Sequence, residues 1–178
     1  MSAIPPMRLT AVVLVAVLTG SSASAHITLE KREAAIGTPY KAVFVVPHGC
    51  AGSATVKIRV QIPEGVVAVK PMPKAGWNLE VVKGKYTGEY DVHGAKLSEG
   101  VKEVVWSGGK LPDEFYDEFV ISTSLTAGLK PNTTLYFPTV QECEQGISRW
   151  IDIPAEGEAV HGGEEKTPAP GVKLMPKP

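Results

Sequence analysis

The sequence contains few cysteines, few aromatic residues and almost no excess of charge. Two cysteines occur among 178 residues, aromatic side chains make up 7% of the chain, and 18 basic residues balance 19 acidic ones. A net charge this close to zero argues against nucleic acid or an anionic membrane as the partner. The chain also lacks Gly-x-Ser-x-Gly, His-Glu-x-x-His and phosphate-loop motifs. We therefore expect a protein that is not an enzyme.

Long apolar runs are missing as well, apart from one at the amino terminus. Arg8 precedes an apolar run over residues 9–18, and a box of small residues ends at Ala25. A bilayer-spanning helix needs about 20 apolar residues, so this run has the length of a signal-peptide core. We predict a signal peptide over residues 1–25 and a mature protein that is periplasmic or secreted.

Cleavage after Ala25 would make His26 the first residue of the mature chain. The α-amine and the imidazole Nδ1 of such a residue can close a chelate ring around a borderline metal such as Cu(II). His26 is therefore a candidate copper ligand, and processing itself would create the site.

The two cysteines, Cys50 and Cys143, are expected to pair. An even number of cysteines in an exported chain favours a disulfide, which here would close a loop of more than ninety residues. Thiolate coordination of a metal is the alternative. The chain has no Cys-x-x-Cys spacing, and free thiolates would oxidise outside the cytoplasm.

The mature chain alternates apolar and polar residues in short runs, with no sustained helical spacing. In residues 55–62 the alternation places Val56, Ile58, Val60 and Ile62 on one face of a strand. Strands are predicted over the following ranges, each bounded by Gly, Pro, Asn or Asp: Ile27–Lys31, Tyr40–Pro47, Ala54–Ile62, Trp77–Val82, Lys102–Trp106, Phe115–Leu125, Thr133–Val140 and Ser148–Ile153. This pattern predicts one all-β domain over residues 26–153, an antiparallel β-sandwich of immunoglobulin or cupredoxin-like type, with a closed barrel as the alternative.

The composition changes after residue 153. Residues 154–178 contain five prolines, four glycines and no aromatic side chain. Such a segment buries too little apolar surface to offset its ordering entropy. We predict a disordered C-terminal tail.

A copper site on His26 needs a further donor, and a carboxylate oxygen suits Cu(II). Acidic and aromatic residues alternate over residues 113–119. If Phe119 points into the core, Asp117 and Glu118 project from opposite faces of the strand. The alternative is a solvated acidic edge that discourages aggregation.

Seven short motifs are spread over the mature chain: residues 26–30 (HITLE), 46–50 (VPHGC), 60–65 (VQIPEG), 70–77 (KPMPKAGW), 106–109 (WSGG), 116–119 (YDEF) and 136–143 (YFPTVQEC). With these motifs the chain resembles the YcnI-like domain, a former domain of unknown function found in exported bacterial proteins. The resemblance implies a β-sandwich that binds one Cu(II) at a solvent-exposed monohistidine brace. It also implies a role in copper homeostasis beside CopC/CopD-like or PCuAC-like proteins.

Carried over by position, the resemblance makes His26 the brace residue and Glu118 the carboxylate ligand. Trp150 becomes the tryptophan near the metal, in preference to Trp77 and Trp106, because it follows the segment that the disulfide would tether. Asp117 is the neighbouring acid that a one-residue shift in strand phase would exchange with Glu118.

Two other functions remain open at this point. An oxidative copper enzyme of monooxygenase type would need a second internal histidine, either His48 or His93. In a metal-free protein-interaction sandwich, His26 would have no function of its own. It would simply be the residue that follows the peptidase cleavage site.

Overall fold

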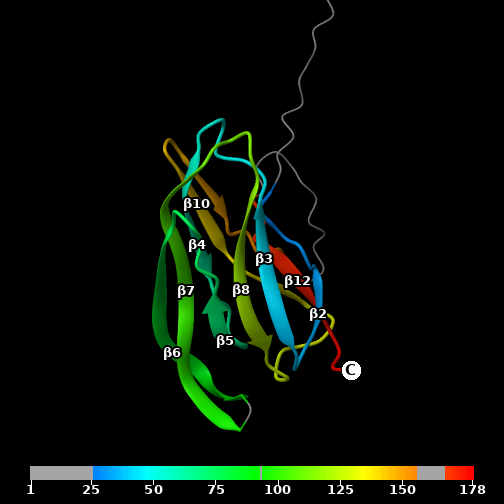
Figure 1. Ribbon diagram of the computed structural model, residues 1–178. Helices are drawn as coiled ribbons and strands as arrows, with labels where there is room; N and C mark the ends of the chain where they lie inside the picture. Colours follow the sequence, from blue (N-terminus) through cyan, green and yellow to red (C-terminus); the bar gives the residue numbers. More distant parts are fainter. Residues whose placement is uncertain (1–25, 93, 156–166) are drawn as a thin grey trace, which may run out of the picture.

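The computed structural model describes residues 26–92, 94–155 and 167–178, and these residues fold as an all-β structure (Figure 1). The predicted signal peptide lies outside them. The strands are β1 (Thr28–Leu29), β2 (Glu33–Ala35), β3 (Pro39–Val46), β4 (Thr55–Gln61), β5 (Val66–Pro71), β6 (Asn78–Val92), β7 (Ala95–Leu111), β8 (Asp117–Leu125), β9 (Thr134–Tyr136), β10 (Thr139–Cys143), β11 (Ile147–Trp150) and β12 (Gly171–Met175). No helix in these ranges is long and apolar enough to cross a membrane.

The strands form a sandwich of two large sheets with a small third sheet at one side. One large sheet has the order β1-β3-β8-β5 and the other the order β11-β10-β4-β7-β6. The third sheet, β2-β12-β9, lies beside β1, which contacts β12 (Figure 1). All named pairs are antiparallel except β12 with β2. The predicted antiparallel β-sandwich is confirmed.

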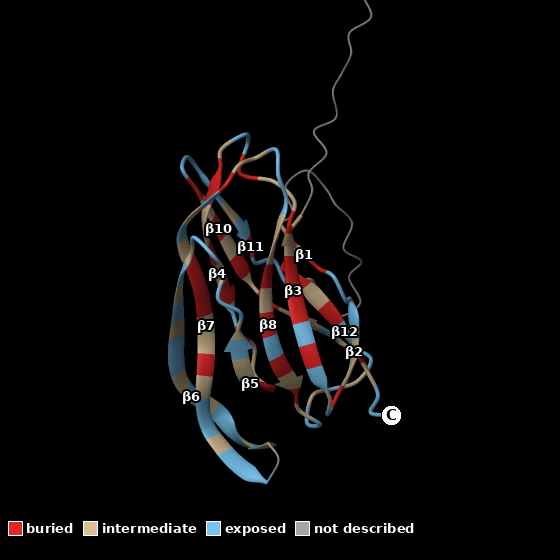
Figure 2. Ribbon diagram, in the orientation of Figure 1, coloured by how far each residue is buried: buried red, intermediate tan, exposed pale blue. Residues whose placement is uncertain are grey.

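The core lies between the two large sheets, where the inward faces of the strands are buried (Figure 2). Phe119 of β8 packs edge-to-face against Trp77 and Trp106, with ring centroids 5.0 and 5.4 Å apart. The Trp106 indole N–H donates to the carbonyl oxygen of Met72 at 3.1 Å, so this large side chain is buried without losing its hydrogen bond. Two of the three tryptophans therefore pack around one phenylalanine.

Strand β4 shows how the sequence pattern becomes a buried face. Ile58 and Val60 are fully buried, as the alternation predicts. The pairing of β4 with β7 shifts register between Thr55 and Lys57. Beyond this bulge the inward face changes, so Thr55 is fully buried. Val56, which the alternation places inward, is only half-buried. The hydroxyl of Thr55 thereby enters the core.

Strands β6 and β7 run well beyond the predicted ranges and form a long hairpin that projects from one end of the sandwich (Figure 1). Glu64, in the turn before β5, fastens this hairpin. Its carboxylate accepts hydrogen bonds from Lys102 of β7 and from the Tyr90 hydroxyl of β6. The hydrogen bond from Lys102, more than any other interaction, lowers the pKa of Glu64 below its usual value.

The prediction of a disordered tail over residues 154–178 is not confirmed. Residues 171–175 form β12, which pairs with β2 on one side and β9 on the other. Val172 and Leu174 are buried in the core. The alternation in this segment is short and lies among prolines, so it did not indicate a strand. The strand is stabilised by β2 and β9, which are far away in the sequence. The folded domain therefore extends past residue 153.

The predicted strand Thr133–Val140 is in fact two strands in different sheets. The chain leaves β9 and enters β10 at Phe137 and Pro138. Pro138 has no amide hydrogen to donate to a ladder, and the Phe137 amide donates to Pro170 rather than to a sheet partner. The segment thus connects the third sheet to the sheet that contains Trp150. Strands β2 and β5 were not predicted.

Candidate metal centre

The imidazole of His26 contacts the indole of Trp150 at one edge of the sandwich. The two ring centroids are 5.2 Å apart and the ring planes meet at 69°, an edge-to-face arrangement. His26 is half-buried, whereas Trp150 at the end of β11 is only 5% exposed. Along a strand, residues two positions apart share a face, so a strand that began at His26 would point its imidazole outward together with Thr28. Because His26 precedes β1, its ring can instead turn toward Trp150.

A groove of about 420 Å³ opens beside His26. The start of β1, the β9 strand and the residues just before β12 line it, and Arg32 and Tyr136 are among the lining residues. Thus residues of the segment predicted to be a tail help to build the surroundings of His26.

The Trp150 indole is held from the core side by Gln141 of β10. The indole N–H donates to the Gln141 side-chain oxygen at 3.1 Å. The Gln141 amide nitrogen in turn donates to the His48 carbonyl oxygen at 2.7 Å and to the Thr55 hydroxyl at 2.8 Å. Gln141 was not among the residues predicted for the site. The one available signal was a polar residue at an inward position of β10, between Thr139 and Cys143.

The predicted disulfide is present. Cys50 and Cys143 are bonded, with a Cα–Cα distance of 6.0 Å. The bond joins the turn after β3 to the end of β10. In that turn the Gly49 amide donates to Asp113 at 2.9 Å. A side chain at Gly49 would lie 1.8 Å from the Ser53 carbonyl oxygen, so the close approach of the two backbones requires glycine.

His48 lies in the same turn, and its ring nitrogens are not available at the surface. Nδ1 is 2.6 Å from the carbonyl oxygen of Gly49. A carbonyl oxygen can only accept, so Nδ1 is the donor in this contact. Nε2 is buried and has no hydrogen-bond partner among the described residues. His93 lies outside the described residues.

Asp117 and Glu118 project from opposite faces of β8, as predicted. Asp117 pairs in register with the buried Val46, and its carboxylate accepts from Lys74 at 2.6 Å. The same ammonium group donates to the Glu118 carbonyl oxygen at 3.1 Å and lies 5.1 Å from the Phe119 ring centroid. Asp117 is therefore engaged in an ion pair on the core side of the strand.

Glu118 lies on the outer face of the first sheet. It pairs with Val45 of β3, which pairs in turn with Thr28 of β1. Residues paired across a sheet share a face, so Thr28, Val45 and Glu118 form one outward row, about 10 Å long across two strand spacings. Among the described residues the Glu118 carboxylate has no hydrogen-bond or ion-pair partner. The structure thus brings His26 and Trp150 into contact and places Glu118 farther along the sheet.

Nearly all of the folded chain matches a known protein family. A sequence model described as "Domain of unknown function (DUF1775)" matches residues 26–174. The chain belongs to the DUF1775 family. The match begins at His26 and runs through most of β12, so the DUF1775 domain includes both the candidate site and the last strand.

A solved structure supports the fold of this DUF1775 chain. It is an uncharacterized protein from Nocardia farcinica, whose crystal structure is described as revealing an immunoglobulin-like fold. The two are 25% identical, the match covers 84% of this chain and 98% of that one, and the TM-score is 0.59. The predicted immunoglobulin-like architecture is therefore confirmed. Among curated proteins, no significant match to the chain is found.

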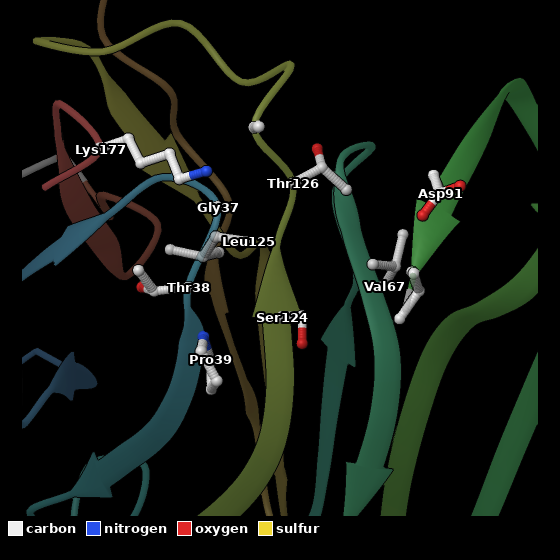
Figure 3. Close-up of a pocket in the computed structure, with 11 residues that line it drawn as sticks. Gly37, Thr38, Pro39, Val67, Asp91, Ser124, Leu125, Thr126 and Lys177 are labelled. Atoms are coloured by element: carbon white, nitrogen blue, oxygen red, sulfur yellow. The ribbon is translucent and has the colours of Figure 1, made fainter. Parts of the chain in front are cut away.

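The DUF1775 domain has a second depression at the opposite end of the first sheet (Figure 3). Its volume is about 370 Å³, and Asp91, Thr126 and Lys177 are among the side chains that line it. Thr126 follows β8 at the end away from Asp117 and Glu118. This depression is therefore separate from the surroundings of His26.

Proposed function

We propose that this DUF1775 protein is an exported copper-binding protein of the YcnI-like type. In this proposal, removal of residues 1–25 frees the α-amine of His26, and the amine and imidazole of that residue hold one Cu(II) ion. The protein serves copper trafficking and homeostasis by binding and release. It does not catalyse a reaction.

The contact between His26 and Trp150 carries the proposal. A strand-edge histidine with no structural role would be expected to lie in solvent. Here its imidazole packs on a tryptophan that is itself hydrogen-bonded in the core. A ring fixed on one side, next to an open groove, has its orientation set before a metal arrives.

The available donors fit a brace better than a site built from side chains alone. Within residues 26–92, 94–155 and 167–178, no group of three His, Cys, Asp or Glu side chains could hold a metal ion. The α-amine of a cleaved His26 adds a nitrogen that belongs to no side chain. One carboxylate would complete a mixed nitrogen and oxygen set of the kind Cu(II) accepts.

We assign that carboxylate to Glu118 rather than Asp117. Glu118 lies on the outer face of the first sheet, about 10 Å from Thr28 across two strand spacings. Its carboxylate is unpaired among the described residues. Asp117 points to the other face and neutralises Lys74. Recruiting Asp117 to copper would deprive that ammonium group of its carboxylate partner and leave it with the Glu118 carbonyl oxygen.

An oxidative copper enzyme is the weaker proposal. Such chemistry needs a second histidine with a ring nitrogen that can reach the metal. In His48, Nδ1 faces the Gly49 carbonyl oxygen and Nε2 is buried. His93, the other candidate, lies outside the described residues, so among these His48 is the candidate for that histidine. A groove-side site on a single histidine is better suited to exchange of copper with other exported carriers, such as CopC/CopD-like or PCuAC-like proteins.

The experiment that tests the proposed function starts from the protein as exported. The intact mass of the secreted or periplasmic protein gives its first residue, and the same sample is then titrated with Cu(II) under electron paramagnetic resonance. We expect a chain that begins at His26 and binds one equivalent in a nitrogen- and oxygen-ligated signal. A chain that begins at His26 and leaves only the spectrum of free Cu(II) contradicts the proposal.

A further inference from the structure

Gln141 is a buried amide at the centre of the β10 strand. It is 1% exposed, and its strand neighbours on the same face, Thr139 and Cys143, are buried as well. A buried glutamine is costly unless its polar atoms are all paired. The hydrogen-bond partners of the Gln141 side chain therefore indicate what this residue does.

Two of the three hydrogen bonds of the Gln141 side chain have one possible direction, and they fix the direction of the third, to Thr55. The His48 carbonyl oxygen can only accept, so it must face the amide nitrogen. The Trp150 indole N–H can only donate, so it must face the amide oxygen. A flipped amide would place two donors together at Trp150 and two acceptors together at His48. The orientation of Gln141 is thus fixed by its neighbours.

The network continues from Gln141 to the disulfide. The Thr55 hydroxyl accepts from Gln141 at 2.8 Å and lies 3.8 Å from the Cys143 sulfur. The disulfide and the β4 bulge therefore hold one end of the network, and Trp150 is at the other end. The Trp150 ring is the group in this network that contacts His26.

We propose that Gln141 is a positioning residue that orients the Trp150 indole against the imidazole of His26. Gln141 does not touch the metal in this proposal; it acts through Trp150. Its importance for copper rests on the proposed function, whereas the positioning itself is a property of the copper-free protein.

The test uses the mature protein beginning at His26, with Gln141→Met as the main variant. Methionine keeps the length of the side chain, but its thioether is only a weak acceptor for Trp150 and cannot donate to His48. Thr123→Val is the matched control, because Thr123 is 3% exposed and donates to the Val67 carbonyl oxygen at 2.7 Å on the other sheet. Both variants lose buried hydrogen bonds, but only one disturbs Trp150.

The copper-free readout is the nuclear Overhauser contact between the His26 imidazole protons and the Trp150 indole protons. We expect strong contacts in the wild type and in T123V, and their loss in Q141M. Hydrogen exchange of the Trp150 indole N–H should be at least about tenfold faster in Q141M than in T123V, since a buried donor loses its acceptor. Unchanged contacts and unchanged exchange in Q141M overturn the proposal.

If Q141M does not fold, Trp150→Phe replaces it, because it deletes the same hydrogen bond from the indole side and keeps the other two bonds of Gln141. Loss of contacts between His26 and the phenyl ring supports the positioning role, and retained contacts overturn it.

A copper measurement separates the two proposals. With CuCl2 as the probe, Q141M should bind about 10-fold to 100-fold more weakly than T123V, as is typical when the support of a metal ligand is removed. Equal affinities in Q141M and T123V overturn a role of Gln141 in copper binding. Absence of copper binding in the wild type contradicts the proposed function but leaves the copper-free contacts as the test of positioning.

Discussion

The imidazole of His26 lies edge-to-face on the indole of Trp150, with 5.2 Å between the ring centroids. These residues lie far apart in the sequence and beside different sheets, since His26 leads into β1 and Trp150 ends β11. The contact therefore forms only when the sandwich has closed. Any metal held by His26 would therefore lie near Trp150, one of the three tryptophans of the chain.

That proximity predicts selective quenching of tryptophan fluorescence by Cu(II). Trp77 and Trp106 both pack on Phe119, whereas Trp150 contacts His26. We expect quenching of the mature protein to saturate at one equivalent of Cu(II), and Trp150→Phe to remove most of it. Trp77→Phe is the control and should leave the quenching in place. The opposite ranking of the two variants would place the metal away from His26.

The assignment of the carboxylate predicts a difference between two adjacent residues. Glu118→Gln should change the Cu(II) electron paramagnetic resonance spectrum, because it removes an oxygen donor from the outer face. Asp117→Asn should leave the spectrum alone and lower the free energy of unfolding by about 1 kcal/mol at most, as expected for a partly exposed ion pair with Lys74. A larger spectral change in D117N would reverse the assignment.

Strand β12 should contribute to stability although it lies in a segment rich in proline and glycine. Leu174 is 1% exposed, and its neighbour Lys173 points outward with an ion pair of 4.0 Å to Glu33. We expect Leu174→Ala to lower the free energy of unfolding by about 2 to 5 kcal/mol and Lys173→Ala by about 1 kcal/mol or less. Urea unfolding measures both. Equal, small effects would mean that β12 does not pack in solution.

The strands that sequence patterns predicted well are those whose period-two alternation is long and bounded by turns. The face of β4 with Ile58 and Val60 is an example. The alternation failed where pairing with distant partners decides the structure. Residues 171–175 are a strand because β2 and β9 flank them, and no local pattern contains that information. The long β6–β7 hairpin exceeds its predicted ranges for the same reason, since Glu64 fastens it from outside.

The hydrogen bonds from the β6–β7 hairpin to the Glu64 carboxylate predict that the stability of the protein depends on pH. The hydrogen bond from Lys102 lowers the pKa of Glu64 below its usual value near 4.5, so the folded state favours the charged form. Its stabilising contribution is present above pH 4.5 and is lost as the pH falls through the lowered pKa. We expect Glu64→Gln to flatten part of the decline in stability below pH 4.5.

The control for this prediction is Glu80→Gln, which removes an exposed carboxylate elsewhere on β6. Thermal unfolding at a series of pH values from 3 to 7 compares the two variants. A decline with acid in E64Q that is as steep as in E80Q would show that Glu64 does not hold the hairpin.

The candidate site was predictable in part. The leader indicated His26, and the cysteine count indicated the Cys50–Cys143 bond, because both signals are local or compositional. The contact of His26 with Trp150 could not be derived from alternation, which directs the imidazole outward with Thr28. Gln141 was missed because its role depends on three partners from three separate segments.

The measurement that tests the central claim most directly compares two forms of the protein that differ by one residue. One begins at His26, and the other keeps Ala25 in front of it, so the α-amine is moved out of chelating reach while the imidazole is unchanged. Competitive titration with Cu(II) gives the affinity of each. We predict tight binding of one equivalent only by the form that begins at His26. Equal affinities would contradict the claim that processing creates the metal site.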